Sequence, residues 1–159
     1  MKILDRMPYY ETPTLLSFGE TTVEIRRFQI LVWVRLRSRR FPAILDTGHS
    51  HNFLLSERHL HDWAEVDSLE QIGQVEVNRT VLPQFAADLW LHANQRGTRN
   101  ALSQSHRLVM HDGITVVPEG APNAPRLPLL GLKAITTNKL RLMLDGKRRE
   151  VTLSLSGWF

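Results

Sequence analysis

The tetrapeptide Leu45-Asp46-Thr47-Gly48 is the part of the sequence best suited to chemistry, because it places a carboxylate in a tight turn directly after an apolar stretch, residues 41–45. Two carboxylates in contact cannot both ionise comfortably, so one keeps a proton and acts as an acid while the other acts as a base. Such a pair can activate a water molecule for hydrolysis. A single carboxylate cannot play both parts.

The chain offers no second carboxylate of this kind. Asp88, Asp112 and Asp145 are not followed by Thr-Gly or Ser-Gly. A symmetric dimer would supply the partner, because a two-fold axis brings the same residue of two copies together. The alternative is that Asp46 is an ordinary turn residue, a common role for Asp before Gly.

The elements around this turn are predicted to be short strands. Residues 30–36 and 41–45 are rich in β-branched and aromatic residues and are joined by the polar turn 37–40, which favours a hairpin. Further strands are expected over 52–55, 74–77, 80–82, 85–91, 107–110, 114–117, 140–144 and 150–155. Asp-Gly pairs predict hairpins at 111–113 and 145–147.

Helices are expected to be few. Ser56 is a candidate N-cap for a short helix over 57–64, and a second short helix is expected over 133–138. Residues 1–22 are predicted to be an irregular N-terminal extension, and the proline-rich segment 118–128 a loop. Many short strands and little helix indicate one all-β domain, residues 23–159, of barrel or sandwich type.

The composition fits a globular protein, with 42% apolar and 23% charged residues in 159. There is no cysteine, and therefore neither a disulfide framework nor thiolate chemistry. We see no signal peptide and no apolar run long enough to span a membrane, and we expect a cytoplasmic protein. The net charge is +4 and the arginines are clustered. A nucleic-acid-binding surface would be expected to have aromatic residues between these charges, or a recognition helix. Neither is present, so we do not expect nucleic acid as a partner.

The order of these features resembles the retropepsin-like family of single-lobe, homodimeric aspartic peptidases. The resemblance covers residues 29–155 and rests on Leu45-Asp46-Thr47-Gly48 and on the later Leu129-Leu130-Gly131-Leu132, which precedes a short helix. It implies a closed β-barrel of the acid-protease type with one or two short helices. It also implies a peptide or protein substrate and no cofactor.

The resemblance implies a role for each residue of the two motifs. Asp46 would be catalytic, Thr47 would join the two active-site turns across the dimer, and Gly48 would let the substrate approach closely. Gly131 would be buried beneath the turn, and it could border a substrate pocket together with His49, Ser50 and Leu130. Family members usually have Ala or Ser after the glycine, so His49 is a departure that bears on substrate preference and on activity.

A flap is implied over such a site, and by sequence order it falls near Ile72, Gly73 and Gln74, or extends to Arg79-Thr80. The loop 94–100 is a second candidate lid. The apolar C-terminus is expected to interleave with its partner in the dimer, so deleting residues 157–159 should weaken dimerisation.

The seven histidines raise the question of a metal site. His49 and His51, and likewise His59 and His61, are i,i+2 pairs that share a face only on a strand. A zinc site would need a third ligand at suitable spacing, and none is apparent, so we predict no metal.

The sequence therefore predicts an aspartic endopeptidase that hydrolyses peptide bonds with water held between two Asp46 carboxylates of a homodimer. The first alternative is a peptide-binding module of the same fold with weak or no catalysis. A β-barrel that binds metal or nucleic acid through its histidines and arginines ranks below both.

Overall fold

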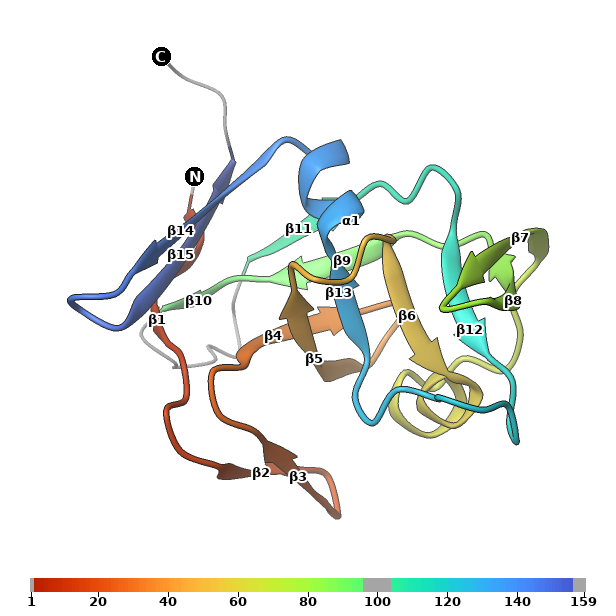
Figure 1. Ribbon diagram of the computed structural model, residues 1–159, viewed down its shortest axis with the longest axis horizontal. Coiled ribbons are helices and arrows are strands. Elements are labelled where there is room, and N and C mark those ends of the chain that lie inside the picture. The colour runs from red at the N-terminus through yellow and green to blue at the C-terminus, as the bar shows by residue number, and fades with distance from the viewer. Residues whose placement is uncertain (1, 96–103, 156–159) are drawn as a thin grey trace.

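The computed structural model describes residues 2–95 and 104–155 and consists mostly of β-strands (Figure 1). Its largest sheet has nine strands and curls into half a barrel. The strands lie in the spatial order β11 (Ser105–Leu108), β9 (Leu89–His92), β4 (Ile30–Arg35), β5 (Arg40–Asp46), β13 (Leu129–Gly131), β6 (Phe53–Ser56), β12 (Ile114–Val117), β8 (Thr80–Phe85) and β7 (Gln71–Val77).

A second sheet of four strands lies at one end of the molecule, beside the N-terminus (Figure 1). Its order is β10 (Asn94–Gln95), β1 (Lys2–Pro8), β15 (Glu150–Leu155) and β14 (Leu140–Asp145). A separate hairpin joins β2 (Thr14–Phe18) to β3 (Thr21–Ile25). The prediction that residues 1–22 are irregular is therefore wrong. Apolar side chains of β1 such as Ile3, Leu4 and Met7 are buried, and this burial holds the segment against β15.

Two short helices complete the described fold. The first contains a π-helical turn, η1 (His59–Trp63), and the Ser56 hydroxyl accepts a hydrogen bond from the His59 N–H at 3.1 Å, as expected of an N-cap. The second is α1 (Leu132–Thr137), which directly follows β13. Both lie close to the predicted positions.

Two of the predicted hairpins form, β4 with β5 and β14 with β15, and the strands expected over 74–77 and 80–82 pair as a third hairpin, β7 with β8. The hairpin predicted at Asp112-Gly113 is wrong. A turn does form there, with Gly113 at a φ of +77° and its N–H bonded to the Met110 carbonyl at 2.9 Å. The strands beyond the turn separate, however, because all four residues of β12 are buried and the strand inserts between β6 and β8. β11 pairs with β9 instead.

The strand order around β13 positions the site described below. β13 runs parallel to β5 on one side and antiparallel to β6 on the other, although β5 and β6 are consecutive in sequence. Because β13 separates them, the connection from β5 to β6, which contains Asp46-Thr47-Gly48, must pass over the end of β13 (Figure 1).

The all-β prediction is confirmed. The outer strands β11 and β7 do not pair with each other, so the described residues do not close the barrel that the resemblance implies. Within residues 2–95 and 104–155, no helix is long and apolar enough to cross a membrane. Most of the second candidate lid and the C-terminal residues 157–159 lie outside the described part of the chain.

Candidate functional site

The Asp46 turn begins at the last residue of β5. Asp46 is half-buried, and Thr47 and Gly48 are exposed. The Gly48 N–H donates a hydrogen bond to Asp46 Oδ1 at 2.9 Å, and the His49 N–H donates to the Asp46 carbonyl at 3.1 Å. The turn therefore holds the carboxylate in a fixed orientation at a surface that water can reach.

The Asp46 turn packs on β13. Gly131 is in register with Asp46, and its N–H donates to the Asn52 carbonyl at 2.8 Å. The next N–H, that of Leu132, donates to the His49 carbonyl at 2.7 Å. A Cβ at position 131 would lie 1.9 Å from the His51 carbonyl oxygen and 2.7 Å from His49 Cδ2. Only glycine allows the backbone of residues 49–51 to pack so closely on β13.

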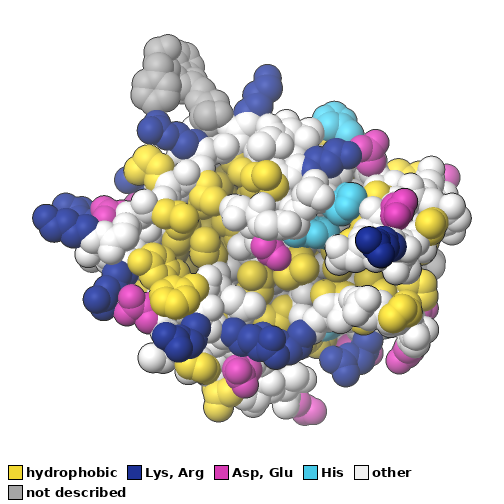
Figure 2. All heavy atoms as spheres, viewed as in Figure 1, with side chains coloured by type: hydrophobic (Ala, Val, Ile, Leu, Met, Phe, Trp, Pro, Cys, Tyr) yellow, Lys and Arg dark blue, Asp and Glu magenta, His cyan; other side chains and the backbone are white. Residues whose placement is uncertain are grey.

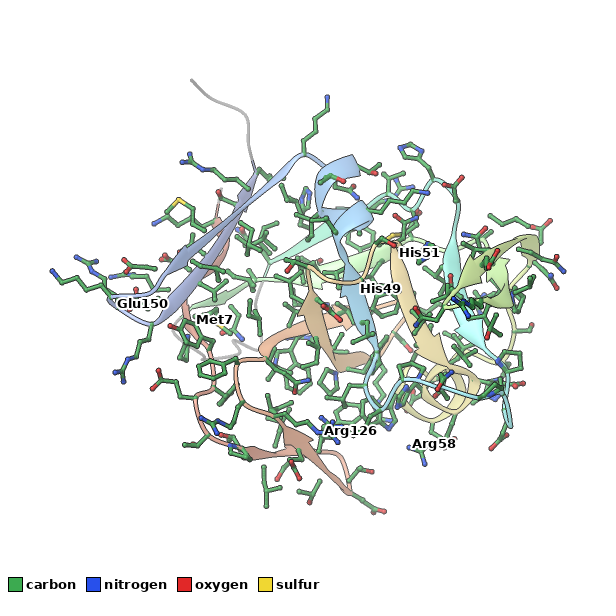
Figure 3. The ribbon with its side chains drawn as sticks, in the orientation of Figure 1. Met7, His49, His51, Arg58, Arg126 and Glu150 are labelled. Carbon is green, nitrogen blue, oxygen red and sulfur yellow. The ribbon has the colours of Figure 1, made fainter. Side chains whose placement is uncertain are left out.

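His49 follows the turn and is half-buried, whereas Ser50 is exposed. The His49 and His51 rings lie 5.4 Å apart, centroid to centroid, and Figure 3 labels both next to β13 and β6. Burial lowers the pKa of His49 below its usual value, the nearby His51 lowers it further, and the Asp46 carboxylate opposes the shift. The ring nitrogen Nε2 is buried and has no hydrogen-bond partner among the described residues. His49 is therefore neutral at neutral pH and has an unused polar atom.

A cavity of about 140 Å³ adjoins His49. Its floor is formed by three buried side chains of neighbouring strands, Leu54 of β6, Leu82 of β8 and Val117 of β12, which make a small apolar cluster separate from the main core. Its walls come from the β7–β8 hairpin, the loop 118–128 and β13, and are formed by Val77, Asn78, Thr80, Pro122, Asn123, Pro125 and Leu129.

The predicted flap, near Ile72–Gln74 or extending to Arg79-Thr80, falls on the β7–β8 hairpin. Ile72, Gly73 and Gln74 lie within β7, away from the turn of the hairpin, where Gly73 pairs with Gln84. The turn itself is Asn78-Arg79, where both residues have positive φ, as a two-residue hairpin turn requires. The end of the hairpin that lines the cavity beside His49 is therefore formed by Val77, Asn78 and Thr80.

Two other predicted pocket residues lie elsewhere. Leu130 is fully buried and pairs with Phe53 inside the sheet, and Gly131 is buried beneath the turn. Neither lines the cavity. The sequence reasoning missed Pro122, Asn123 and Pro125, because a proline-rich segment indicates a loop but not what the loop packs against. A useful signal would have been that residues 118–128 lead directly into Leu129-Leu130-Gly131.

A second histidine is buried in η1. The His59 ring lies 4.4 Å from the Trp63 ring, centroid to centroid, and its Nδ1 faces the Ser56 N–H at 3.5 Å. Burial lowers its pKa to about 4, with a smaller contribution from the positive charge of Arg58, while the Arg126 backbone carbonyl and Asp62 oppose the shift. Within the described residues, no group of three or more His, Asp or Glu side chains could hold a metal ion.

Comparison with known proteins gives no identification. No model of a known protein family matches this chain, and no curated protein matches it significantly.

Proposed function

We propose that this chain is an aspartic endopeptidase of the retropepsin type that acts as a homodimer. The observation that carries the proposal is the Asp46 turn seated on Gly131 of β13. The two motifs that carry the sequence resemblance are 85 positions apart, from Asp46 to Gly131, yet Leu45 pairs with Leu130 and Asp46 with Gly131 in the fold. An ordinary surface turn needs no buried glycine beneath it.

The proposed chemistry uses two Asp46 carboxylates, one from each subunit. One is ionised and takes a proton from a water molecule, while the other is protonated and donates to the carbonyl oxygen of the scissile peptide bond. The two titrations belong to the pair, because each carboxylate changes the affinity of the other for the proton.

The second subunit is proposed because a single chain offers one such turn, and because large apolar side chains are exposed next to the turn and on the four-stranded sheet. Leu132, whose N–H bonds to the turn, is 42% exposed, and Met143 and Leu144 of β14 are 48% and 63% exposed. Figure 2 shows hydrophobic side chains gathered at the centre and left of this face, with Lys and Arg side chains around them. Burial of such a surface against a second copy would stabilise a dimer.

The test is peptide-library cleavage by the wild type and by Asp46→Asn. We expect Asp46→Asn to lose at least about 10³-fold in kcat/KM, since its amide can neither accept nor supply the proton. Asp145→Asn is the matched control. Asp145 also accepts backbone N–H bonds in a turn, from Lys147 and Arg148, but it lies in the β14–β15 hairpin, and this variant should keep full activity.

A mixing experiment tests the dimer. Adding an excess of Asp46→Asn subunits to the wild type should reduce activity more than dilution does, because mixed dimers contain only one competent carboxylate. Wild-type activity that persists unchanged in such mixtures, or an active monomer in sedimentation, would contradict the proposal.

The alternative function is peptide binding without efficient hydrolysis. The position of His49 favours it, because the imidazole interacts electrostatically with the Asp46 carboxylate. The half-buried imidazole also stands where members of the family usually have Ala or Ser, so it narrows the space beside the turn. Tight binding of peptides that remain intact at acidic and neutral pH would favour this alternative.

A further inference from the structure

A cavity of about 460 Å³ lies near the start of β5, whereas the Asp46 turn lies at the end of that strand. Its walls come from the turn between β2 and β3, from η1 and from the turn that precedes β5. Figure 1 shows the β2–β3 hairpin and η1 at the lower end of the molecule. The seven residues of β5 span about 20 Å, so a ligand in this cavity does not reach the Asp46 turn.

Arg39 lines this cavity and is held in one orientation, but one edge of its guanidinium group is unused. Nη1 donates to the Asp62 carbonyl at 2.9 Å and to Glu65 Oε1 at 3.4 Å, and Cζ lies 4.5 Å from the centroid of the Phe18 ring. Nε and Nη2 donate to no described residue, and neither is among the buried atoms that lack a partner, so solvent reaches both. The side chain is 33% exposed. Nε and Nη2 together form the edge with which arginine binds a carboxylate through two parallel hydrogen bonds.

The same edge of another arginine binds a carboxylate elsewhere in this chain. Arg107 Nε and Nη2 donate to Asp88 Oδ2 at 3.0 Å and 2.6 Å. Arg39 Nη2 lies beside Gly19, which also lines the cavity, and a Cβ at position 19 would lie 2.8 Å from this nitrogen. Arg39 therefore has the geometry of a carboxylate-binding arginine, and the glycine leaves room beside it.

The other charged groups limit what can bind. Arg58, which Figure 3 labels near η1, lines the cavity and forms no ion pair within residues 2–95 and 104–155. Glu20 and Asp62 line it as well and are exposed. The two arginines and the two acidic residues balance, which disfavours a dianion such as a phosphate ester. A single carboxylate can bind at Arg39, and the ammonium group of a free amino acid would be attracted to the acidic side chains.

Two aromatic side chains give the cavity an apolar wall. Phe18 and Trp63 line it, and their ring centroids lie 5.2 Å apart. The volume is about three times the roughly 150 Å³ that holds one benzene ring, so an apolar side chain fits together with a carboxylate. Apolar walls with a few placed polar groups are the usual form of small-molecule sites.

We propose that this cavity binds the α-carboxylate of an amino acid, either free or at the C-terminus of a peptide, with an apolar side chain against Phe18 and Trp63. The carboxylate oxygens accept hydrogen bonds from Arg39 Nε and Nη2, and Arg58 adds a second positive charge. The site is independent of the proposed function, because no residue that lines it belongs to the Asp46 turn or to β13.

Four small ligands test the role of the carboxylate. L-phenylalanine and N-acetyl-L-phenylalanine carry it, whereas L-phenylalaninamide and N-acetyl-L-phenylalaninamide do not. Each is titrated into the full chain, and binding is followed by the NMR signals of the arginine Nε–H groups. We expect the two carboxylates to bind at least about 10-fold more tightly than the two amides, as hydrogen bonds to a charged group predict. The Arg39 Nε–H signal should move with the carboxylates only.

The same ligands control for net charge and distinguish the two sources of the carboxylate. L-phenylalanine and N-acetyl-L-phenylalaninamide are both neutral overall, so a difference between them is not a general electrostatic effect. Tighter binding of L-phenylalanine would identify the free amino acid, whose ammonium group the acidic side chains attract. Tighter binding of N-acetyl-L-phenylalanine would identify the C-terminus of a peptide. L-alanine should bind more weakly than L-phenylalanine, and equal binding would contradict the role of the aromatic wall.

A pair of variants tests the arginine itself. Arg39→Lys keeps the positive charge but lacks the edge with two donors, so its affinity for the two carboxylates should fall about 10-fold. Arg107→Lys is the matched control, because Arg107 binds Asp88 outside the cavity, and its affinity for the ligands should equal that of the wild type. Urea denaturation of both variants shows whether each is folded at the temperature of the titration.

Equal binding of carboxylates and amides by the wild type, or binding of none of the four ligands, would overturn the inference. Unchanged affinity of a folded Arg39→Lys variant would overturn it as well. If that variant does not fold, the ligand series and the Arg39 Nε–H signal of the wild type decide the question. None of these measurements depends on peptide cleavage, so this inference and the proposed function can fail separately.

Discussion

Two histidines of this molecule share the same electrostatic signature in different surroundings. His49 and His59 each have a lowered pKa, with burial as the main cause, and each has a buried Nε2 without a partner of ordinary geometry. His59, only 1% exposed, packs on Trp63 inside the main core region. His49 is half-buried and borders a cavity beside the Asp46 turn.

The difference teaches that a perturbed pKa does not by itself mark a functional site, because buried structural groups are perturbed as well. The groups packed around each histidine indicate whether its role is structural or functional. The His59 ring is 1% exposed and contacts Trp63 and the Ser56 N–H, although His59 also lines a separate cavity of about 260 Å³. His49 borders the cavity of about 140 Å³ beside the Asp46 turn and touches the Gly131 backbone of β13, and its Nε2 is buried as well.

The largest effect is expected from adding a side chain at Gly131, on which the Asp46 turn packs. Gly131→Ala would place a Cβ 1.9 Å from a backbone oxygen that cannot swing away, so the turn or β13 must shift. We expect a loss of about 3–5 kcal/mol in the free energy of unfolding, measured by urea denaturation. Gly146→Ala is the control, because a Cβ there meets nothing within 4 Å, and its stability should change by less than about 0.5 kcal/mol. A mild effect of Gly131→Ala would mean that the turn is not rigidly seated.

An effect of about 3 kcal/mol is expected from pH acting on His59. The unfolded chain binds a proton on this residue below pH 6.5, whereas the folded chain does so only near pH 4. Stability is therefore fully present above pH 6.5 and falls as the pH drops toward 4, by roughly 1.4 kcal/mol per pH unit.

Urea unfolding of the wild type and of His59→Gln across this range measures that contribution. The variant should lose less stability on acidification than the wild type. Equal acid sensitivity of the two proteins would show that His59 does not titrate in this way, and the comparison with His49 would then fail.

The sequence predicted the local elements better than their pairing. The strand β5, the turn at Asp46 and the cap at Ser56 follow from short-range patterns, and they appear where these patterns placed them. The Asp112-Gly113 signal correctly gave a turn, but the burial of β12 on both faces overrode the hairpin. β1 was missed because its partner, β15, lies at the other end of the chain.

The candidate site shows the same difference between short sequence motifs, which could be predicted, and long-range packing, which could not. Asp46 and Gly131 were identified from motifs, since each sits in a distinctive short sequence. The cavity is built by residues of β6, β7, β8, β12, β13 and the loop 118–128, which only the folded sheet brings together. The sequence pattern did not show which end of the β7–β8 hairpin lies at the cavity, and the positive-φ turn at Asn78-Arg79 forms that end.

The smallest effect on stability, and the sharpest contrast between the two histidines, is expected from replacing each ring with leucine at pH 7.5, where both rings are neutral. His49→Leu should change the free energy of unfolding by less than about 1 kcal/mol, because losing an unpartnered polar atom offsets the loss of packing beside an open cavity. His59→Leu removes the contact with Trp63 and leaves the Ser56 N–H without its acceptor, so it should cost about 2 kcal/mol. Urea denaturation of both variants measures the difference. Equal losses would mean that His49 is as much a core residue as His59.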